Sequence, residues 1–207
     1  SFEKFFQKDN PNVKFYKDFK QNFEDDSRFL LLGIDYQKSV FDSSFLERID
    51  SLSSSLSKNP LFSLVYSPTN AKRISLSNFG AKKSPLLRYN SRESITKDST
   101  YLSKNLHFQE RFIALDNNSV CITLKVKTNV SQEEVLGLIT SVEDLCEKYN
   151  FQYHLAGKLV AEQVYIAKTR EELMKFALVS VVLIIGFLIV TYRSFWLLII
   201  PLTVIGL

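Results

Sequence analysis

Hydrophobic residues are distributed very unevenly along the 207-residue chain. Up to about residue 175 they recur at spacings typical of helices and strands, whereas residues 176–192 carry no charge and residues 195–207 are again apolar. About 20 apolar residues are needed to cross the hydrocarbon core of a bilayer. The pattern therefore predicts a transmembrane helix over 176–192, a truncated second one over 195–207, and a helical connector over 158–175.

The part of the chain in front of the apolar tail alternates between strand and helix patterns. Compact apolar runs predict strands over 28–36, 61–67 and 151–157, and two runs flanking Asn117-Asn118 predict a β-hairpin over 111–128. Helical spacing predicts one helix between Asp42, as N-cap, and Pro60. A second helix opens with a capping box from Ser131 to Glu134.

This order of elements predicts an α+β domain over residues 28–157. Strand-helix-strand units on either side of a weakly patterned excursion, residues 69–106, match the ferredoxin-like, split β-α-β arrangement. One face of the strand after Asn118 is predicted to be buried, because Val120, Ile122, Leu124 and Val126 alternate with more polar residues.

Residues 1–27 are expected to form an amphipathic helical lead-in. Pro11 suits the first turn of a helix, and Phe15, Phe19 and Phe23 lie four residues apart. We interpret this aromatic stripe as packing into the core. The alternative is a surface that faces lipid or substrate.

Charge and composition narrow the range of functions. The chain has 26 Lys and Arg against 22 Asp and Glu, without a run of five like charges, so we expect no nucleic-acid partner. Its first residues lack the apolar region of a signal peptide. Because the chain also lacks an initiating Met and stops within an apolar run, we interpret it as a fragment of a longer protein.

No residue pattern predicts an enzyme, a cofactor or a metal site. His107 and His154 are far apart in sequence, and the six glycines form no phosphate-binding loop. Cys121 and Cys146 are expected on different faces of the fold, which argues against a disulfide. Adjacent Glu171 and Glu172 are interpreted as a solvated face at the membrane boundary rather than a proton-coupling pair.

The break between the two apolar runs is the one candidate site. Tyr192, Arg193 and Trp196 are predicted to form a turn at the membrane interface, where aromatic and basic side chains are favoured. Basic residues flank the first span on both sides, so charge alone leaves the orientation of the large domain open.

The succession of motifs resembles the resistance-nodulation-division (RND) superfamily of transporters, in its MMPL-like or "predicted exporter" branch. Phe23-Glu24 stands where these proteins have Phe-Gly. Ala156-Gly157 stands at the Thr-Gly of their Thr-Gly-x-Pro segment, and the Pro of that segment is missing here. The matching stretches, in chain order, are FYKDFKQNFEDDSRFLLLGID, SVFDSSFLERIDSLSSSL, LVYSPTNAKRI, RFIALDNNSVCITLKV, HLAGKLVAEQV and TYRSFWLLIIPLTVIGL.

The resemblance implies a chain that runs from just after transmembrane helix 1, through an extracytoplasmic porter domain and helix 2, into helix 3. Such proteins lie in the bacterial inner membrane and export lipids or other hydrophobic or amphiphilic molecules, driven by an ion gradient. The expected partners are the lipid bilayer, the substrate, the remaining homologous half of the transporter and, in a homo-oligomer, further copies. Arg193 would mark a cytoplasmic turn, and the ion-coupling residues would lie outside this chain.

Two other functions remain open from the residues themselves. The chain is also compatible with a membrane-anchored extracytoplasmic binding or sensory module that recruits a partner. A third interpretation is an accessory subunit of protein export, whose substrate is a translocating polypeptide.

Overall fold

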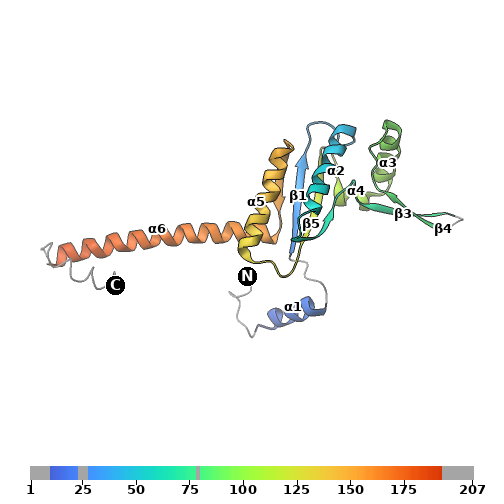
Figure 1. The fold of residues 1–207 in the computed structure, drawn as a ribbon. Helices are drawn as coiled ribbons and strands as arrows, with labels where there is room; N and C mark the ends of the chain where they lie inside the picture. Colours follow the sequence, from blue (N-terminus) through green and yellow to red (C-terminus); the bar gives the residue numbers. More distant parts are fainter. Residues whose placement is uncertain (1–9, 23–27, 78–79, 193–207) are drawn as a thin grey trace. The chain divides into compact units, whose positions relative to one another are not determined.

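The structure is a computed structural model that describes residues 10–22, 28–77 and 80–192. The chain falls into two compact units that divide after Gln163. The helices are α1 (Pro11–Asn22), α2 (Ser43–Ser57), α3 (Arg92–Lys104), α4 (Leu106–Phe112), α5 (Gln132–Lys148) and α6 (Lys158–Tyr192) (Figure 1). The strands are β1 (Phe29–Asp35), β2 (Phe62–Tyr66), β3 (Lys72–Ser77), β4 (Gly80–Pro85), β5 (Ser119–Val126) and β6 (Gln152–Ala156).

A four-stranded antiparallel sheet forms the centre of the first unit. Its strand order is β2-β5-β1-β6, and Leu32 in β1 lies opposite Ile122 of β5 and Leu155 of β6. Strands β3 and β4 form a separate two-stranded sheet. The unit is therefore a mixed architecture of sheet and helices, which agrees with the predicted α+β class at that level.

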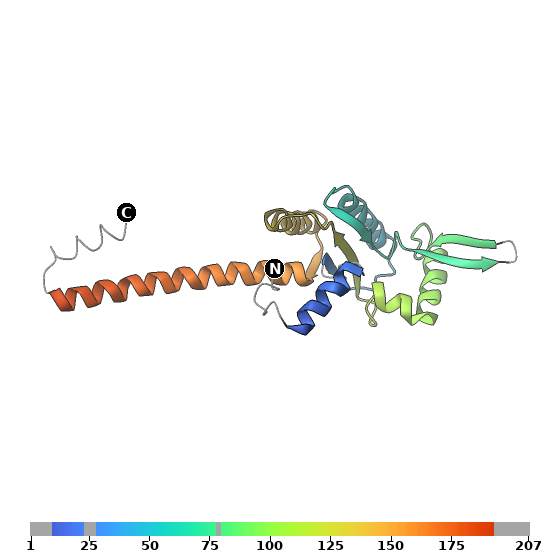
Figure 2. The same cartoon turned by 90° about the horizontal axis from the view of Figure 1, so that it is seen from below.

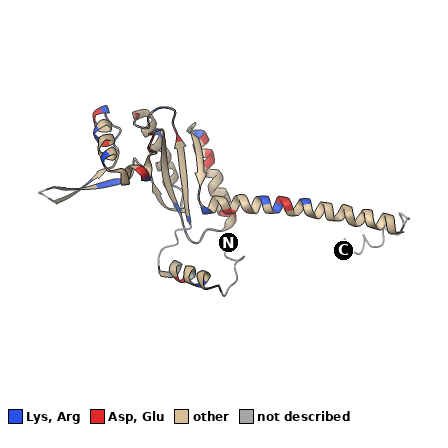
Figure 3. Ribbon diagram, turned by 180° about the vertical axis from the view of Figure 1, so that it is seen from behind, with Lys and Arg blue, Asp and Glu red and all other residues tan. Residues whose placement is uncertain are grey.

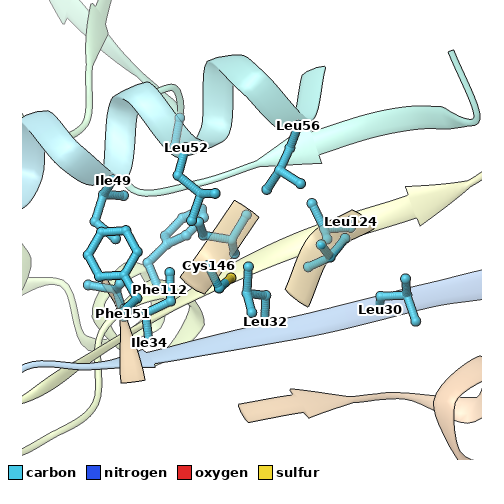
Figure 4. Close-up of a cluster of buried hydrophobic side chains, with 14 of the residues drawn as sticks. Leu30, Leu32, Ile34, Ile49, Leu52, Leu56, Phe112, Leu124, Cys146 and Phe151 are labelled. Atoms are coloured by element: carbon cyan, nitrogen blue, oxygen red, sulfur yellow. The ribbon is translucent and has the colours of Figure 1, made fainter. Parts of the chain in front are cut away.

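The hydrophobic core lies between one face of the four-stranded sheet and helices α2 and α5. The predicted buried face of β5 is confirmed, because Val120, Ile122, Leu124 and Val126 are all buried. Helices α2 and α5 lie on this same face of the sheet (Figure 2). Side chains from strands and helices meet there, among them Leu30, Leu32, Ile34, Ile49, Leu52, Leu56, Phe112, Leu124, Cys146 and Phe151 (Figure 4).

The predicted N-terminal caps of the two core helices are confirmed. Asp42 is the N-cap of α2, and its carboxylate accepts a hydrogen bond of 2.9 Å from the Phe45 amide. Ser131 and Glu134 form the capping box of α5, in which each side chain accepts a hydrogen bond from the other residue's backbone amide. These caps satisfy amide groups that a helix start leaves without an intrahelical partner.

The predicted hairpin over 111–128 is wrong in its first strand. Helix α4 continues to Phe112, and only Ile113 forms an isolated bridge, to Val120. Strand β5 pairs with β1 along residues 119–125, whereas β2 covers only residues 123–126 of its other edge. Ile113 reaches Val120 on the part of that edge that β2 leaves open. The turn itself suits its residues, because Asn117 has a φ of 57° and Asn tolerates this left-handed conformation.

The prediction that the aromatic stripe of the lead-in packs into the core is wrong for the two phenylalanines that the structure describes. Helix α1 forms as predicted, but Phe15 is 73% exposed and Phe19 is 40% exposed. Phe23 lies outside the described residues. Helical spacing reports which residues share a side of a helix, and it does not report what covers that side.

A glycine joins the sheet to the long last helix. Gly157 has a φ of 128°, and a Cβ atom at this position would come within 2.5 Å of the Phe29 carbonyl oxygen. Only glycine fits both the backbone conformation and the close approach to β1. Ala156-Gly157, singled out in the sequence, is thus a structural junction between β6 and α6.

Candidate functional site

Helix α6 is the candidate membrane segment. It runs without interruption through 35 residues, so the predicted connector over 158–175 is helical and continuous with the apolar stretch. All charged residues of α6 lie in its first part, and residues 176–192 contain no charged residue (Figure 3). Seventeen helical residues span about 26 Å. In length and composition, α6 is the one helix of the described residues suited to cross a membrane.

The charged residues in front of the apolar stretch form a solvated band. Lys175 Nζ lies 2.6 Å from Glu171 Oε1, one turn away on the same helix, and both side chains are largely exposed. Glu172 is exposed as well. The apolar residues 176–191 are almost all exposed as well, so the interpretation of these acids as a solvated face stays a prediction.

The predicted interfacial turn can be placed only at its first residue. Tyr192 is the last residue of α6, while Arg193 and Trp196 lie outside the described residues. The structure therefore does not bring these three residues together, and the turn stays a prediction.

The excursion over 69–106 is organised around a buried carboxylate. Asp98 of α3 is fully buried, and its Oδ1 accepts hydrogen bonds of 2.9 Å from Arg73 Nη2 and Arg88 Nη2. Its Oδ2 accepts from Arg88 Nε at 2.9 Å and from the Arg88 backbone amide at 3.0 Å. We call Arg73, Arg88 and Asp98 the Asp98 clamp. It joins β3 and the segment after β4 to α3.

The surroundings of the clamp stabilise the ionised form of Asp98. Burial alone would raise the pKa of this carboxyl group, but the hydrogen bonds from Arg88 and the positive charges of Arg73 and Arg88 outweigh burial and lower it. The guanidinium of Arg73 also lies 4.5 Å from the centre of the Tyr101 ring, and its Nε donates to Ser84 Oγ at 3.2 Å.

The clamp was not predicted from the sequence. A signal was present in α3, where Asp98 lies between Ile95 and Leu102 at the spacing of one helix side, and all three are buried. An acid at a core position of a helix predicts a buried ion pair, because an isolated charge there is too costly. The identities of its partners could not be read from the sequence, since Arg73 is 25 residues away.

A pocket of about 290 Å³ lies between α3, α4 and the turn before β5, lined by Phe41, Ser99, Thr100, Ser103, Gln109 and Asn117. The lining hydroxyl groups of α3 donate to carbonyl oxygens of their own helix, as in Thr100 Oγ1 to Thr96 O at 2.8 Å. Gln109 Nε2 donates to Asn117 Oδ1 at 3.2 Å. Apart from Phe41, the described lining side chains carry hydroxyl and amide groups, which can bind polar groups.

The described residues contain no group of three or more His, Cys, Asp and Glu suited to a metal ion. His154 is exposed on β6, and its Nε2 lies 3.0 Å from Asp35 Oδ2 on the neighbouring strand. Cys121 is half-buried on β5, whereas Cys146 is fully buried on α5, and both are free thiols.

The mixed domain leads directly into an apolar helix that is long enough to cross a membrane. The MMPL family model matches residues 46–207, a range that contains most of α2, all of α3 to α6 and every described strand except β1. The chain belongs to the MMPL family, whose members are membrane transporters of the RND type. No curated protein matches the sequence.

Proposed function

We propose that this chain supplies a porter domain and membrane helices of an RND-type exporter, driven by an ion gradient, that moves lipids or other hydrophobic or amphiphilic molecules. The observation that carries the proposal is the family match, because it covers both the mixed domain and α6. The transporter lies in the bacterial inner membrane, with the mixed domain on the extracytoplasmic side. Its partners are the bilayer, the substrate, the second homologous half of the transporter and, in a homo-oligomer, further copies.

The strand order supports a ferredoxin-like fold for this porter domain. Strands β1 and β2, joined by α2, are separated by β5, and β6 lies on the other side of β1. Both connecting helices, α2 and α5, lie on one face of the antiparallel sheet (Figure 2). Two such interleaved units form the split β-α-β arrangement.

The chemistry of the described residues supports transport rather than catalysis. The one buried acid, Asp98, is held by two arginines, and, apart from Phe41, the described side chains that line the pocket beside α3 carry hydroxyl and amide groups. Acids that couple transport to an ion gradient lie within transmembrane helices. In the described part of α6 the apolar stretch over 176–192 contains none, so coupling belongs to other parts of the transporter.

Orientation is tested by cysteine labelling in intact cells. Ser103→Cys places a thiol on an exposed position of α3, and a membrane-impermeant maleimide should label it if the domain is extracytoplasmic. The unsubstituted chain is the matched control, because it reports any background from Cys121 and Cys146. Labelling that occurs only after the cells are lysed would place the domain in the cytoplasm and overturn this part of the proposal.

Export is tested by disrupting the gene and measuring where radiolabelled lipids lie, in the inner membrane or at the cell surface. We expect one lipid class to accumulate in the inner membrane, and an ionophore that dissipates the proton gradient should reproduce this accumulation in undisrupted cells. An unchanged lipid distribution would contradict lipid export. Crosslinking of the domain to newly secreted polypeptides would instead favour an accessory role in protein export.

A further inference from the structure

Helix α1 presents aromatic side chains that neither the core nor the proposed transport function uses. Phe15 and Phe19 lie on successive turns, with ring centroids 6.5 Å apart, and both are exposed. Tyr16 is exposed beside them. Adjacent exposed rings on one side of a helix indicate a surface that binds an apolar partner.

The charges of α1 identify the chemistry of that partner. The helix contains Lys14, Lys17 and Lys20 but a single acid, Asp18. A spacing of three residues places the lysines along one side of the helix, and Phe15 and Phe19 lie along another. Aromatic residues on one side and lysines on the other are typical of helices that lie in the headgroup region of an anionic membrane.

The length of α1 points to the same partner. It has 12 residues, and an isolated helix of this length is marginal in water. Its start is capped, because Asn10 Oδ1 accepts a hydrogen bond of 2.9 Å from the Asn12 amide. Burial of its aromatic side in a bilayer would stabilise the helix where an aqueous surface would not.

We infer that α1 is a membrane-surface helix, which lies in the interface of a bilayer containing anionic lipids. Phe15 and Phe19 enter the outer part of the acyl-chain region, and the net positive charge of the helix attracts the lipid phosphates. This inference rests on the insertion of α6 into a membrane, which is part of the proposed function, and it does not depend on the substrate.

Fluorescence quenching by brominated lipids tests the inference with the full chain reconstituted in vesicles. Trp196 is the only tryptophan, so Trp196→Phe supplies a background for single reporters. Phe15→Trp and Phe19→Trp place reporters on the aromatic side of α1, and Lys17→Trp is the matched control on its basic side. Phe187→Trp reports whether α6 is inserted. Bromine atoms near the top of the acyl chains report shallow insertion, and bromine atoms farther down report deep insertion.

We expect shallow bromines to quench the tryptophans at positions 15 and 19 roughly twofold more strongly than the one at position 17. The tryptophan at position 187 should be quenched most strongly by the deep bromines. Equal weak quenching at 15, 19 and 17, with strong quenching at 187, would overturn the surface-helix inference alone. Absence of quenching at 187 would contradict membrane insertion of α6 and with it the proposed function.

Aqueous quenching and lipid charge complete the test. Reporters at 15 and 19 that are shielded from acrylamide and also from brominated lipid are covered by protein, which would overturn the inference. The substitutions Lys14→Gln, Lys17→Gln and Lys20→Gln together should reduce shallow quenching of the position 15 reporter in vesicles of phosphatidylglycerol and phosphatidylcholine. In pure phosphatidylcholine they should have little effect, because the neutral surface does not attract lysine. An equal effect in both vesicles would contradict binding through lipid charge.

Discussion

Replacement of Asp98 by Asn tests whether the Asp98 clamp fixes the excursion to the domain. The side chain is fully buried and accepts four hydrogen bonds, three from Arg88 and one from Arg73. Removal of one partner from a buried ion pair typically costs about 3–5 kcal/mol. The side chains of Arg73 and Arg88 keep exposed fractions of 17% and 38%, so water can solvate them after the change. We therefore expect the lower end, about 3 kcal/mol.

Hydrogen exchange followed by mass spectrometry measures this loss where it occurs. A cost of about 3 kcal/mol corresponds to roughly 100-fold faster exchange in the strands and helix that the clamp connects. The increase should appear in peptides from β3, β4 and α3, and exchange in β1 and β5 should change much less. The full chain in detergent suffices, because the readout is resolved by segment.

The matched control lies on the same helix. Glu93 pairs with Lys97 at 2.6 Å, but both side chains are largely exposed, and such surface pairs contribute about 0–1 kcal/mol. Glu93→Gln should therefore leave the exchange of β3 and β4 nearly unchanged. The reasoning is refuted if Asp98→Asn leaves the protection of these strands intact, or if both substitutions have equal effects.

The clamp also predicts a pH dependence with a definite sign. The pKa of Asp98 in the folded protein lies below its ordinary value of 3.8. A lowered folded pKa means that the ionised group stabilises the fold fully above that ordinary value, and that this stability is lost as the pH falls through the folded pKa. Protection of β3 and β4, corrected for intrinsic exchange, should fall in this acidic range for the native chain. In Asp98→Asn it should not.

Three further substitutions and one labelling experiment test the domain. Gly157→Ala should destabilise it by about 1–3 kcal/mol because of the positive φ and the contact with β1; Gly137→Ala, in α5 with open space around it, should stabilise it by up to about 1 kcal/mol. Urea unfolding measures both, and equal effects would contradict the argument. Ser131→Ala removes the α5 cap and should cost about 1 kcal/mol in the same assay, and an unchanged midpoint would refute the cap. Burial raises the pKa of the Cys146 thiol to about 12, so maleimide should not label it at pH 8 until urea is added; rapid labelling of the folded chain would contradict its burial.

The local elements of this protein could be predicted well from the sequence because their signals are short-range. The side chains of Asp42 and Ser131 reach backbone amides only a few residues away, so both helix starts were correct. The alternation in β5 reports one buried face directly, and the charge-free stretch in α6 depends only on its own residues. The family resemblance is confirmed as well, because it depends on the order of such elements.

Tertiary structure alone decided what each element meets. The segment before Asn117 has the composition of a strand, but residues up to Phe112 continue helix α4, so the segment pairs with β5 only at Ile113. The partners of Asp98 lie 10 and 25 residues away and are brought to it by the fold of the excursion. Local pattern predicts the conformation of most segments and the side that is apolar, whereas the residues that the fold brings together from distant parts of the chain decide what each segment contacts.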